Sequence, residues 1–250
     1  MADLQFRISD YSFTPKIIPS LVTLSLFPLF IFLGLWQLDR ADEKRIIDEG
    51  VRSAIAKPAL ELNNFDLKTL SNEVYRPAKI KGKFDTQHQF LLDNRTHAGR
   101  PGYHVLTPFI FESDHGREAA LINRGWITYK DTRENIPSIK VTENEIEILG
   151  AIKEIPRSIV LNETAQQQTD LAKTNPMLIQ SVDITALNQH LSYTLLPILI
   201  ELDKTEENGY IREWQPYYGS IDKHKAYATQ WFSMAAILLF LYIKLNTKKH

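Results

Sequence analysis

The chain lacks cysteine altogether, and this absence excludes several classes of site. Without cysteine there is no disulfide framework, no thiolate zinc or iron-sulfur centre and no thiol nucleophile. Copper(I) prefers sulfur ligands, and three methionines are too few for a copper chaperone. The chain also lacks a basic excess, since 29 Lys and Arg stand against 30 Asp and Glu. We therefore expect no nucleic-acid partner.

The common motifs of catalysis are missing as well. The sequence contains no GxxxxGKS/T, GxGxxG, GxSxG or HExxH pattern, so the usual phosphate loops and hydrolytic sites are excluded. No pairing of an acid, a base and a nucleophile is visible along the chain. We therefore expect a protein that is not an enzyme.

Charge is absent from two long stretches, one near each end. Residues 17–38 are 22 residues without a charge, and residues 226–243 are 18 more. As helices they reach about 33 and 27 Å, close to the thickness of a bilayer's hydrocarbon core. Buried core helices seldom run this far without a charge, and no small-residue cleavage site follows the first run. The sequence therefore predicts two transmembrane helices, and the lipid bilayer as a partner.

Two spans divide the chain into tails of residues 1–16 and 244–250 and a domain of residues 39–225. Flanking Lys and Arg do not decide which side the domain occupies, because long loops translocate largely regardless of charge. Asp3 and Asp10 make the N-terminal segment unlike an acid-poor transit peptide. We therefore favour a bacterial inner membrane protein over an organellar precursor.

The domain between the spans has the pattern of a β structure. Residues 39–57 continue the first helix, which Pro58 ends. Beyond them, period-two alternation and turn residues predict strands at 73–84, 88–96, 102–113, 117–128, 145–157, 176–183 and 195–203, a short helix at 184–190 and a polar loop at 162–175. The expected fold class is two transmembrane helices flanking a mainly antiparallel β domain, either a barrel or a sandwich.

His224 is the side chain with the clearest chemical potential. It lies two residues before the second apolar run, and helical periodicity places Tyr227, Ala228 and Trp231 on its face. A neutral imidazole there can ligate haem iron while the aromatic rings pack the macrocycle. The alternative is an ordinary interfacial helix start whose His and aromatic side chains anchor its depth. The residues alone leave both interpretations open.

Three separated blocks resemble the surfeit locus protein 1 family, the Shy-type factors for cytochrome c oxidase assembly. The blocks are GLWQLDRADEK at 34–44, ALINRGWIT at 120–128 and HKAYATQWFSMA at 224–235. A fourth segment, GRPGYHVLTPF at 99–109, is similar to a strand of the family. The resemblance covers effectively the whole chain, although residues 130–200 match only loosely and no functional residue is inferred from them.

The resemblance implies a membrane-anchored factor that holds haem a and passes it to the catalytic subunit of the oxidase. It also implies contact with the haem a synthesis machinery, cytoplasmic termini and a periplasmic domain. His224 is then the iron ligand, and the implied cofactor-binding residues are His224, Tyr227, Trp231, Trp36, Gln37 and Arg40. Arg40 is either a contact to a haem propionate or a snorkelling anchor. Gln37 is expected to pair with the other helix or a bound group, because an unpaired amide in hydrocarbon is costly.

The remaining expectations concern the central block and the rival functions. Arg124 is expected to be a structural ion-pair residue and Trp126 a core residue. The main alternative to haem delivery is a scaffold that stabilises oxidase subunits without a cofactor. An enzyme acting on haem or lipid is the weakest hypothesis, because no reactive constellation is visible.

Overall fold

A computed structural model of the chain describes residues 6–8, 11–114, 116–129, 137–155, 175–189, 191–215 and 219–249. The chain forms two compact units, residues 1–50 with 217–250 and residues 51–216. The first is mainly helical and the second is a β domain, and each is described by itself. His115, His190, His250 and nearly all of the predicted loop at 162–175 lie outside the described residues.

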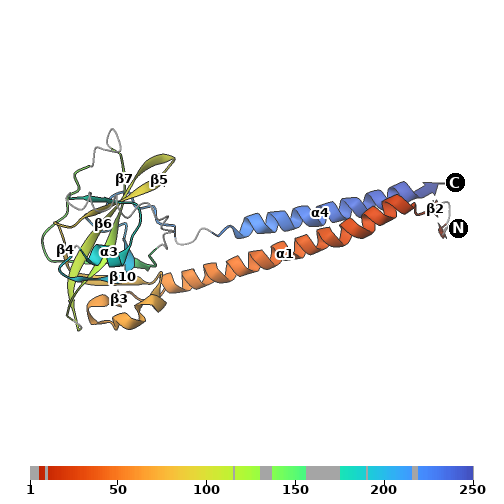
Figure 1. Ribbon diagram of the computed structural model, residues 1–250. Helices are drawn as coiled ribbons and strands as arrows, with labels where there is room; N and C mark the ends of the chain where they lie inside the picture. The colour runs from red at the N-terminus through yellow and green to blue at the C-terminus, as the bar shows by residue number, and fades with distance from the viewer. Residues whose placement is uncertain are drawn as a thin grey trace. The chain divides into compact units, whose positions relative to one another are not determined.

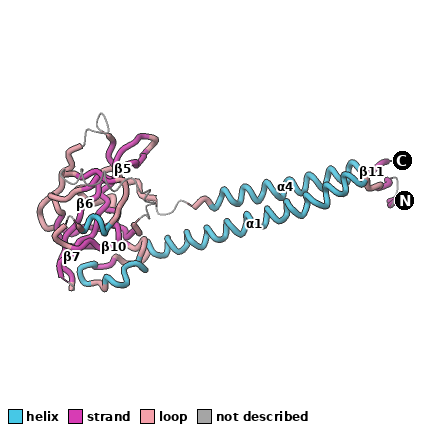
Figure 2. The backbone as a smooth tube through the Cα atoms, in the orientation of Figure 1, coloured by secondary structure: helices cyan, strands magenta, loops and turns pink. Residues whose placement is uncertain are grey.

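Two long helices dominate the helical unit (Figure 1 and Figure 2). Helix α1 spans Ile17–Ile55 and helix α4 spans Ile221–Asn246. The most apolar 18 residues have a mean hydropathy of 2.2 in α1 and 1.5 in α4, with only 6% and 11% of them buried. The core helix of a globular protein would be mostly buried, so these are exposed apolar helices long enough to cross a membrane.

The two helices pack antiparallel along one stripe of each. The stripe consists of residues spaced alternately by three and four, as helix pairs require: Phe30, Gly34, Gln37 and Ala41 on α1, and His224, Ala228, Trp231 and Ala235 on α4. Ala228 and Ala235 are each only 2% exposed. A Cβ atom added at Gly34 would lie 2.5 Å from the Phe232 ring. Small residues thus let the two helices approach closely.

Polar contacts join the N-terminal end of α1 to the C-terminal end of α4. The Ser20 hydroxyl lies 2.8 Å from the Tyr242 hydroxyl, and the Lys16 backbone N–H donates to Asn246 Oδ1 at 2.8 Å. Next to them a three-stranded antiparallel sheet of order β1-β2-β11 contains β1 (Phe6–Ile8), β2 (Tyr11–Phe13) and β11 (Thr247–Lys249). The sequence did not predict this sheet, because three-residue strands carry almost no periodic signal.

Five strands of the second unit close into a barrel. In ring order they are β4 (Pro77–Phe84), β8 (Ile146–Lys153), β10 (Thr194–Leu202), β7 (Gly116–Thr128) and β6 (Arg100–Ser113). The ring closes where β4 pairs with β6, at Lys83 with Ile110 and Phe84 with Phe109. Gly82 permits this approach, since a Cβ there would lie 2.2 Å from the Ile110 carbonyl oxygen. A closed ring removes both edges of these strands.

Shorter elements extend and cover the barrel. The sheet continues through β5 (Phe90–His97) to β9 (Met177–Ile179) on one side and to β3 (Leu60–Glu61) on the other. Two 3₁₀ helices, Leu62–Asn64 and Leu67–Glu73, precede β4. Helix α3 (Ile184–Asn188) begins at Asp183, whose carboxylate accepts from the N–H groups of Thr185 and Ala186.

Alternating side chains fill the barrel. On β4 the pattern of partial and full burial follows the pleat, with Ala78, Ile80 and Phe84 inside. The interior is completed by other apolar side chains, among them Phe109, Phe111, Ala120, Ile122, Ile148, Ile152, Leu196, Ile198, Ile200 and Leu202. A second cluster, including Leu92, Leu106 and Leu121, packs on the outer face. The β domain therefore has its own apolar core.

The structure confirms the predicted fold class and decides between its two forms in favour of the barrel. The seven predicted strands correspond to β4 to β10, and the helical continuation ends at Ile55, shortly before Pro58. The short predicted helix ends at Asn188 rather than at residue 190. Three pairings are parallel, namely β3 with β4, β5 with β9 and, within the barrel, β10 with β7. The last is possible because α3 and its loops return the chain to the start of β10.

Candidate functional site

His224 lies in the first turn of α4 and contacts α1 across the helix pair. Its Nδ1 atom lies 2.8 Å from Oε1 of Gln37. Both side chains are half-buried. The expectation that Gln37 pairs with the other helix is therefore met, and its partner is the imidazole that the sequence singled out.

In a neutral ring, this hydrogen bond decides which nitrogen carries the proton. An amide oxygen only accepts, so Nδ1 of His224 donates its N–H to Gln37. The other nitrogen, Nε2, then keeps its lone pair. A histidine whose one nitrogen donates to a fixed acceptor has the arrangement typical of metal ligands, because the acceptor holds the ring and raises its basicity. The site thus presents an imidazole that Gln37 holds in one orientation.

The aromatic candidates Trp231, Trp36 and Tyr227 differ in how exposed they are. The Trp231 ring packs 5.8 Å from the Phe30 ring between the helices, whereas Trp36 is 43% and Tyr227 is 42% exposed. Helical periodicity explains the difference, because Trp231 follows His224 by seven residues and lies on the packed stripe. Tyr227 follows it by three and lies at the margin of that stripe. The structure therefore offers one packed ring and two exposed rings near the imidazole.

Arg40 lies on the exposed side of α1. Its guanidinium is 5.9 Å from the centre of the Trp36 ring and 2.7 Å from a carboxylate oxygen of Glu43. Both partners of this ion pair are about half exposed. The pair is therefore weak and can exchange, and Arg40 is not brought into contact with Gln37 or His224.

Sequence reasoning missed two features of this neighbourhood, the side chain of Phe30 and the pairing of Glu43 with Arg40. Both have a simple signal. Phe30 lies seven residues before Gln37, the spacing that puts two residues on one packed stripe. Glu43 follows Arg40 by three, the spacing of ion pairs on one helix. Heptad spacing applied to both apolar runs would have identified the interface.

Arg124 lies in the β domain and is one of its largest fully buried side chains, at 1% exposed. The guanidinium donates to Gln89 Oε1, Thr107 Oγ1 and the carbonyl oxygens of Lys140 and Asn208. Burial lowers its pKa. Within the described residues its partners are neutral oxygens, so the expected ion pair is not found there. Its structural role and the burial of Trp126, at 5% exposed, agree with the prediction.

Three histidines of the β domain, His88, His97 and His104, make contacts within the fold. Nδ1 of His88 lies 2.7 Å from Asp85, which also accepts from the Tyr193 hydroxyl. The His97 ring lies 5.2 Å from the Trp126 ring, and the His104 ring lies 5.9 Å from the Trp214 ring. In the part of the chain that the structure describes, no three His, Asp or Glu side chains gather as metal ligands would.

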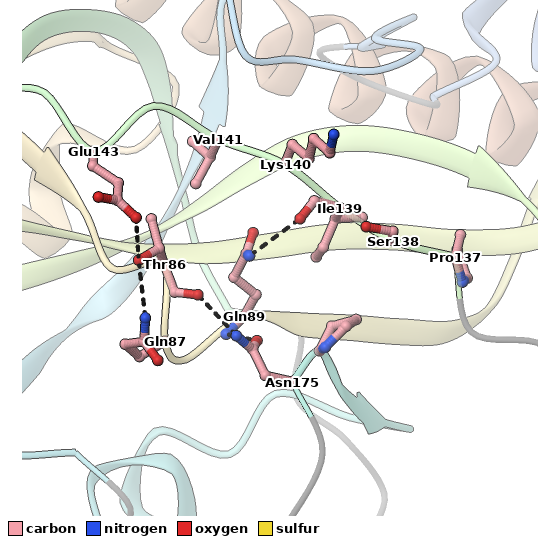
Figure 3. Close-up of a pocket in the computed structure, with 11 residues that line it drawn as sticks. Thr86, Gln87, Gln89, Pro137, Ser138, Ile139, Lys140, Val141, Glu143 and Asn175 are labelled. Atoms are coloured by element: carbon pink, nitrogen blue, oxygen red, sulfur yellow. Dashed lines mark hydrogen bonds between the residues drawn. The ribbon is translucent and has the colours of Figure 1, made fainter.

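A separate cavity of about 670 Å³ opens on the β domain (Figure 3). Its walls carry the side-chain amides of Gln87, Gln89 and Asn175, with Lys140 and Glu143 at the rim. The amides bond to the cavity's own walls, as when Asn175 Nδ2 donates to the Thr86 carbonyl at 2.8 Å. Such self-satisfied polar walls point to no particular ligand.

Comparisons with known proteins agree on one family. The sequence model of the SURF1 family matches residues 24–236, a range that includes Gln37, Arg124 and His224. A SURF1-like protein of Rickettsia prowazekii is 26% identical over 239 residues, covering 88% of this chain and 86% of the relative. Surfeit locus protein 1 of Xenopus tropicalis is 28% identical over 246 residues, covering 90% and 75%. Surfeit locus protein 1 of Mus musculus is 31% identical over 147 residues, covering 52% and 46%.

Proposed function

The chain belongs to the SURF1 family, known as cytochrome c oxidase assembly factors, and on this premise we propose that it binds haem a through His224. In this proposal it is a membrane-anchored assembly factor that passes the haem to the catalytic subunit of the oxidase. The observation that carries the proposal is the 2.8 Å contact between Nδ1 of His224 and Oε1 of Gln37. It leaves Nε2 as the free ligand atom.

The residues around His224 suit a haem. Haem iron takes a neutral imidazole as an axial ligand, and bound haem supplies the redox-active iron that the oxidase needs. Trp231, Tyr227 and Trp36 offer aromatic surface for the macrocycle. Arg40 can exchange its exposed Glu43 partner for a haem propionate, since a guanidinium matches any carboxylate. The exposed apolar faces of α1 and α4 suit the farnesyl tail of haem a.

The proposal includes a location for these elements. Helices α1 and α4 act as two membrane anchors in a bacterial inner membrane, with the β domain in the periplasm and both termini in the cytoplasm. The partners are the oxidase catalytic subunit and the haem a synthesis machinery. The protein acts by binding and transfer and has no enzymatic activity of its own.

The test is an absorption spectrum of the full chain purified from a host that makes haem a. We expect haem in the wild type and its loss in His224→Ala, with His88→Ala on the β domain as the matched control. Gln37→Leu should weaken haem binding by about 10–100-fold, the usual effect of removing a ligand's hydrogen-bond acceptor. A colourless wild type, or unchanged haem in His224→Ala, contradicts the proposal.

The second candidate is a scaffold that stabilises oxidase subunits without haem. The observation that favours it is the apolar surface of the helical unit, where Ile18 and Leu24 are 76% and 74% exposed. Such surface packs equally well against helices of another membrane protein. A colourless wild type that still co-purifies with the oxidase would support this candidate over the first.

A further inference from the structure

The ribbon of strands β5 and β6 carries four basic side chains on one face. In its antiparallel register Arg95 pairs with Gly102, and His97 pairs with Arg100. Residues directly opposite in such a pair share a face, and His104 lies two residues beyond Gly102 on the same strand. We refer to Arg95, His97, Arg100 and His104 as the basic face.

A tight turn makes this ribbon compact. Ala98 and Gly99, the two residues between the strands, have φ angles of 47° and 75°. Two successive positive φ values form the turn that matches the twist of a hairpin. The turn thereby brings His97 opposite Arg100, so that the four basic groups lie along one short stretch of sheet.

Arg95 supplies the strongest sign of a ligand. Its Nε is a buried donor without a hydrogen-bond partner, and no other buried side-chain nitrogen or oxygen in the described residues lacks one. Leaving a buried donor unpaired destabilises a fold, so each such group in a native protein calls for an explanation. An anion bound to the guanidinium provides one.

The backbone around Arg95 is held in place although its guanidinium is not. The indole N–H of Trp126 donates to the Arg95 carbonyl at 3.0 Å. Gly102 makes room for this indole, because a Cβ there would lie 2.6 Å from the Trp126 ring. The His97 ring packs 5.2 Å from the same indole. The Arg95 guanidinium, whose Nε has no hydrogen-bond partner, therefore extends from a fixed backbone position.

His104 is half-buried close to the charges of Arg95 and His97. Asn123 Oδ1 accepts the Gly125 N–H, so its amide nitrogen faces His104 and donates to Nδ1 at 3.0 Å. Burial, with the charges of Arg95 and His97, lowers the pKa of His104 to about 4. The nearest carboxylate to the His97 ring is Glu213 at 3.9 Å, but its side chain is 75% exposed and compensates little.

We propose that the basic face binds an oxyanion, either a carboxylate or a phosphate, with the Arg95 guanidinium as its ion partner. The planar fork of a guanidinium matches both groups with two parallel hydrogen bonds. The oxyanion has two possible sources. One is a propionate of a tetrapyrrole, which rests on the proposed function, and the other is the headgroup phosphate of an anionic lipid.

The experiment compares charged and uncharged members of two ligand pairs on the full chain in micelles. The first pair is iron-free protoporphyrin IX and its dimethyl ester, and the second is dihexanoyl phosphatidylglycerol and dihexanoyl phosphatidylcholine. Affinity and the NMR signal of the Arg95 Nε–H are measured for each ligand. Iron-free porphyrin needs no axial ligand, so His224→Ala should bind it as the wild type does, whatever the fate of the haem proposal.

We expect the charged member of at least one pair to bind about tenfold more tightly than its uncharged partner and to shift the Arg95 signal. Arg95→Gln should abolish that preference, and because this side chain makes no hydrogen bond to a described residue, the variant should fold. The matched control is Arg117→Gln, which changes an exposed arginine near the start of β7, outside the basic face. This variant should retain the preference. A preference in the first pair identifies the propionate and one in the second the lipid phosphate. No preference in either pair, or a preference that survives Arg95→Gln, overturns the proposal.

Discussion

The helical unit and the β domain use the same apolar residue types in opposite ways. In the helices, Ile18 and Leu24 are 76% and 74% exposed, whereas in the barrel Ile122 and Phe109 are fully buried. The overall mean hydropathy of −0.24 averages over this difference. The helical unit therefore exposes the side-chain types that the β domain buries, and the packing of each unit must be considered separately.

Buried polar groups sharpen the comparison. The barrel buries the Arg124 guanidinium and surrounds it with four neutral acceptors. The helix pair instead joins His224 to Gln37 through a single hydrogen bond. The structural Arg124 thus has hydrogen-bond partners for its guanidinium, whereas Nε2 of His224 remains available to bind a ligand.

The largest effect is expected at Arg124. Arg124→Met removes the donor shared by Gln89, Thr107 and two carbonyl groups, and leaves Gln89 Oε1 and Thr107 with only their long 3.4 Å bond to each other, so the free energy of unfolding should fall by about 3–5 kcal/mol. Hydrogen exchange of the β7 amides measures this loss directly. The exposed Arg117→Met should change it by less than about 0.5 kcal/mol. Equal effects of the two variants would mean that the four acceptors are hydrated without the guanidinium.

The strands were predictable because each alternates on its own. The sequence predicts β4 to β10 from local periodicity, since a pleated strand with one buried face must alternate. The closure of the barrel was not predictable, because it depends on the approach of Gly82 to Ile110, 28 positions away in the chain. Any glycine could serve such a role, and nothing local marks this one.

The candidate site was predictable to a similar extent. A polar Gln37 in an apolar run must find a partner, and His224, just before the second apolar run, provides it. The unpaired Nε of Arg95 had no such signal. Its isolation depends on which side chains surround it after folding, and arginines with partners look the same in the sequence.

The next largest effect is expected on the stability of the β domain when the pH is lowered. His104 has a folded pKa of about 4, whereas an unfolded His has about 6.5. Its contribution is complete above pH 6.5 and is lost as the pH falls toward 4, because only the unfolded state takes up the proton in that window. The loss should be on the order of 2–3 kcal/mol by pH 4.5.

Urea unfolding of the wild type and His104→Gln at pH 6.5, 5.5 and 4.5 measures this difference. Asp85 and Glu201 titrate in both proteins, so the difference between them isolates His104. The variant should lose less stability on acidification. Parallel curves would contradict the assignment of a buried neutral imidazole.

A smaller effect is expected in the helix pair. Gly34→Leu introduces a side chain where a Cβ alone would lie 2.5 Å from the Phe232 ring, whereas Gly50 has no atom within 4 Å of such a position. Overpacking of this kind costs about 1–3 kcal/mol, and Gly50→Leu should be neutral or slightly stabilising. The cysteine-free chain allows spin labels at Ser25→Cys and Leu239→Cys to report the distance between the helices. An unchanged distance in Gly34→Leu would show that the pair repacks.

The smallest effect is expected in the charged part of α1, between the apolar run and the barrel. Arg45 lies 3.2 Å from Glu49 and 3.3 Å from Asp42, and all three side chains are at least half exposed. Glu49→Gln should lower the stability of this stretch by less than about 0.5 kcal/mol, because water screens the pair and Asp42 remains as a partner. Hydrogen exchange of the α1 amides at low and high salt measures the effect, which salt should reduce further. A loss above about 1 kcal/mol would mean that water does not screen these ion pairs and that another surface covers residues 42–49.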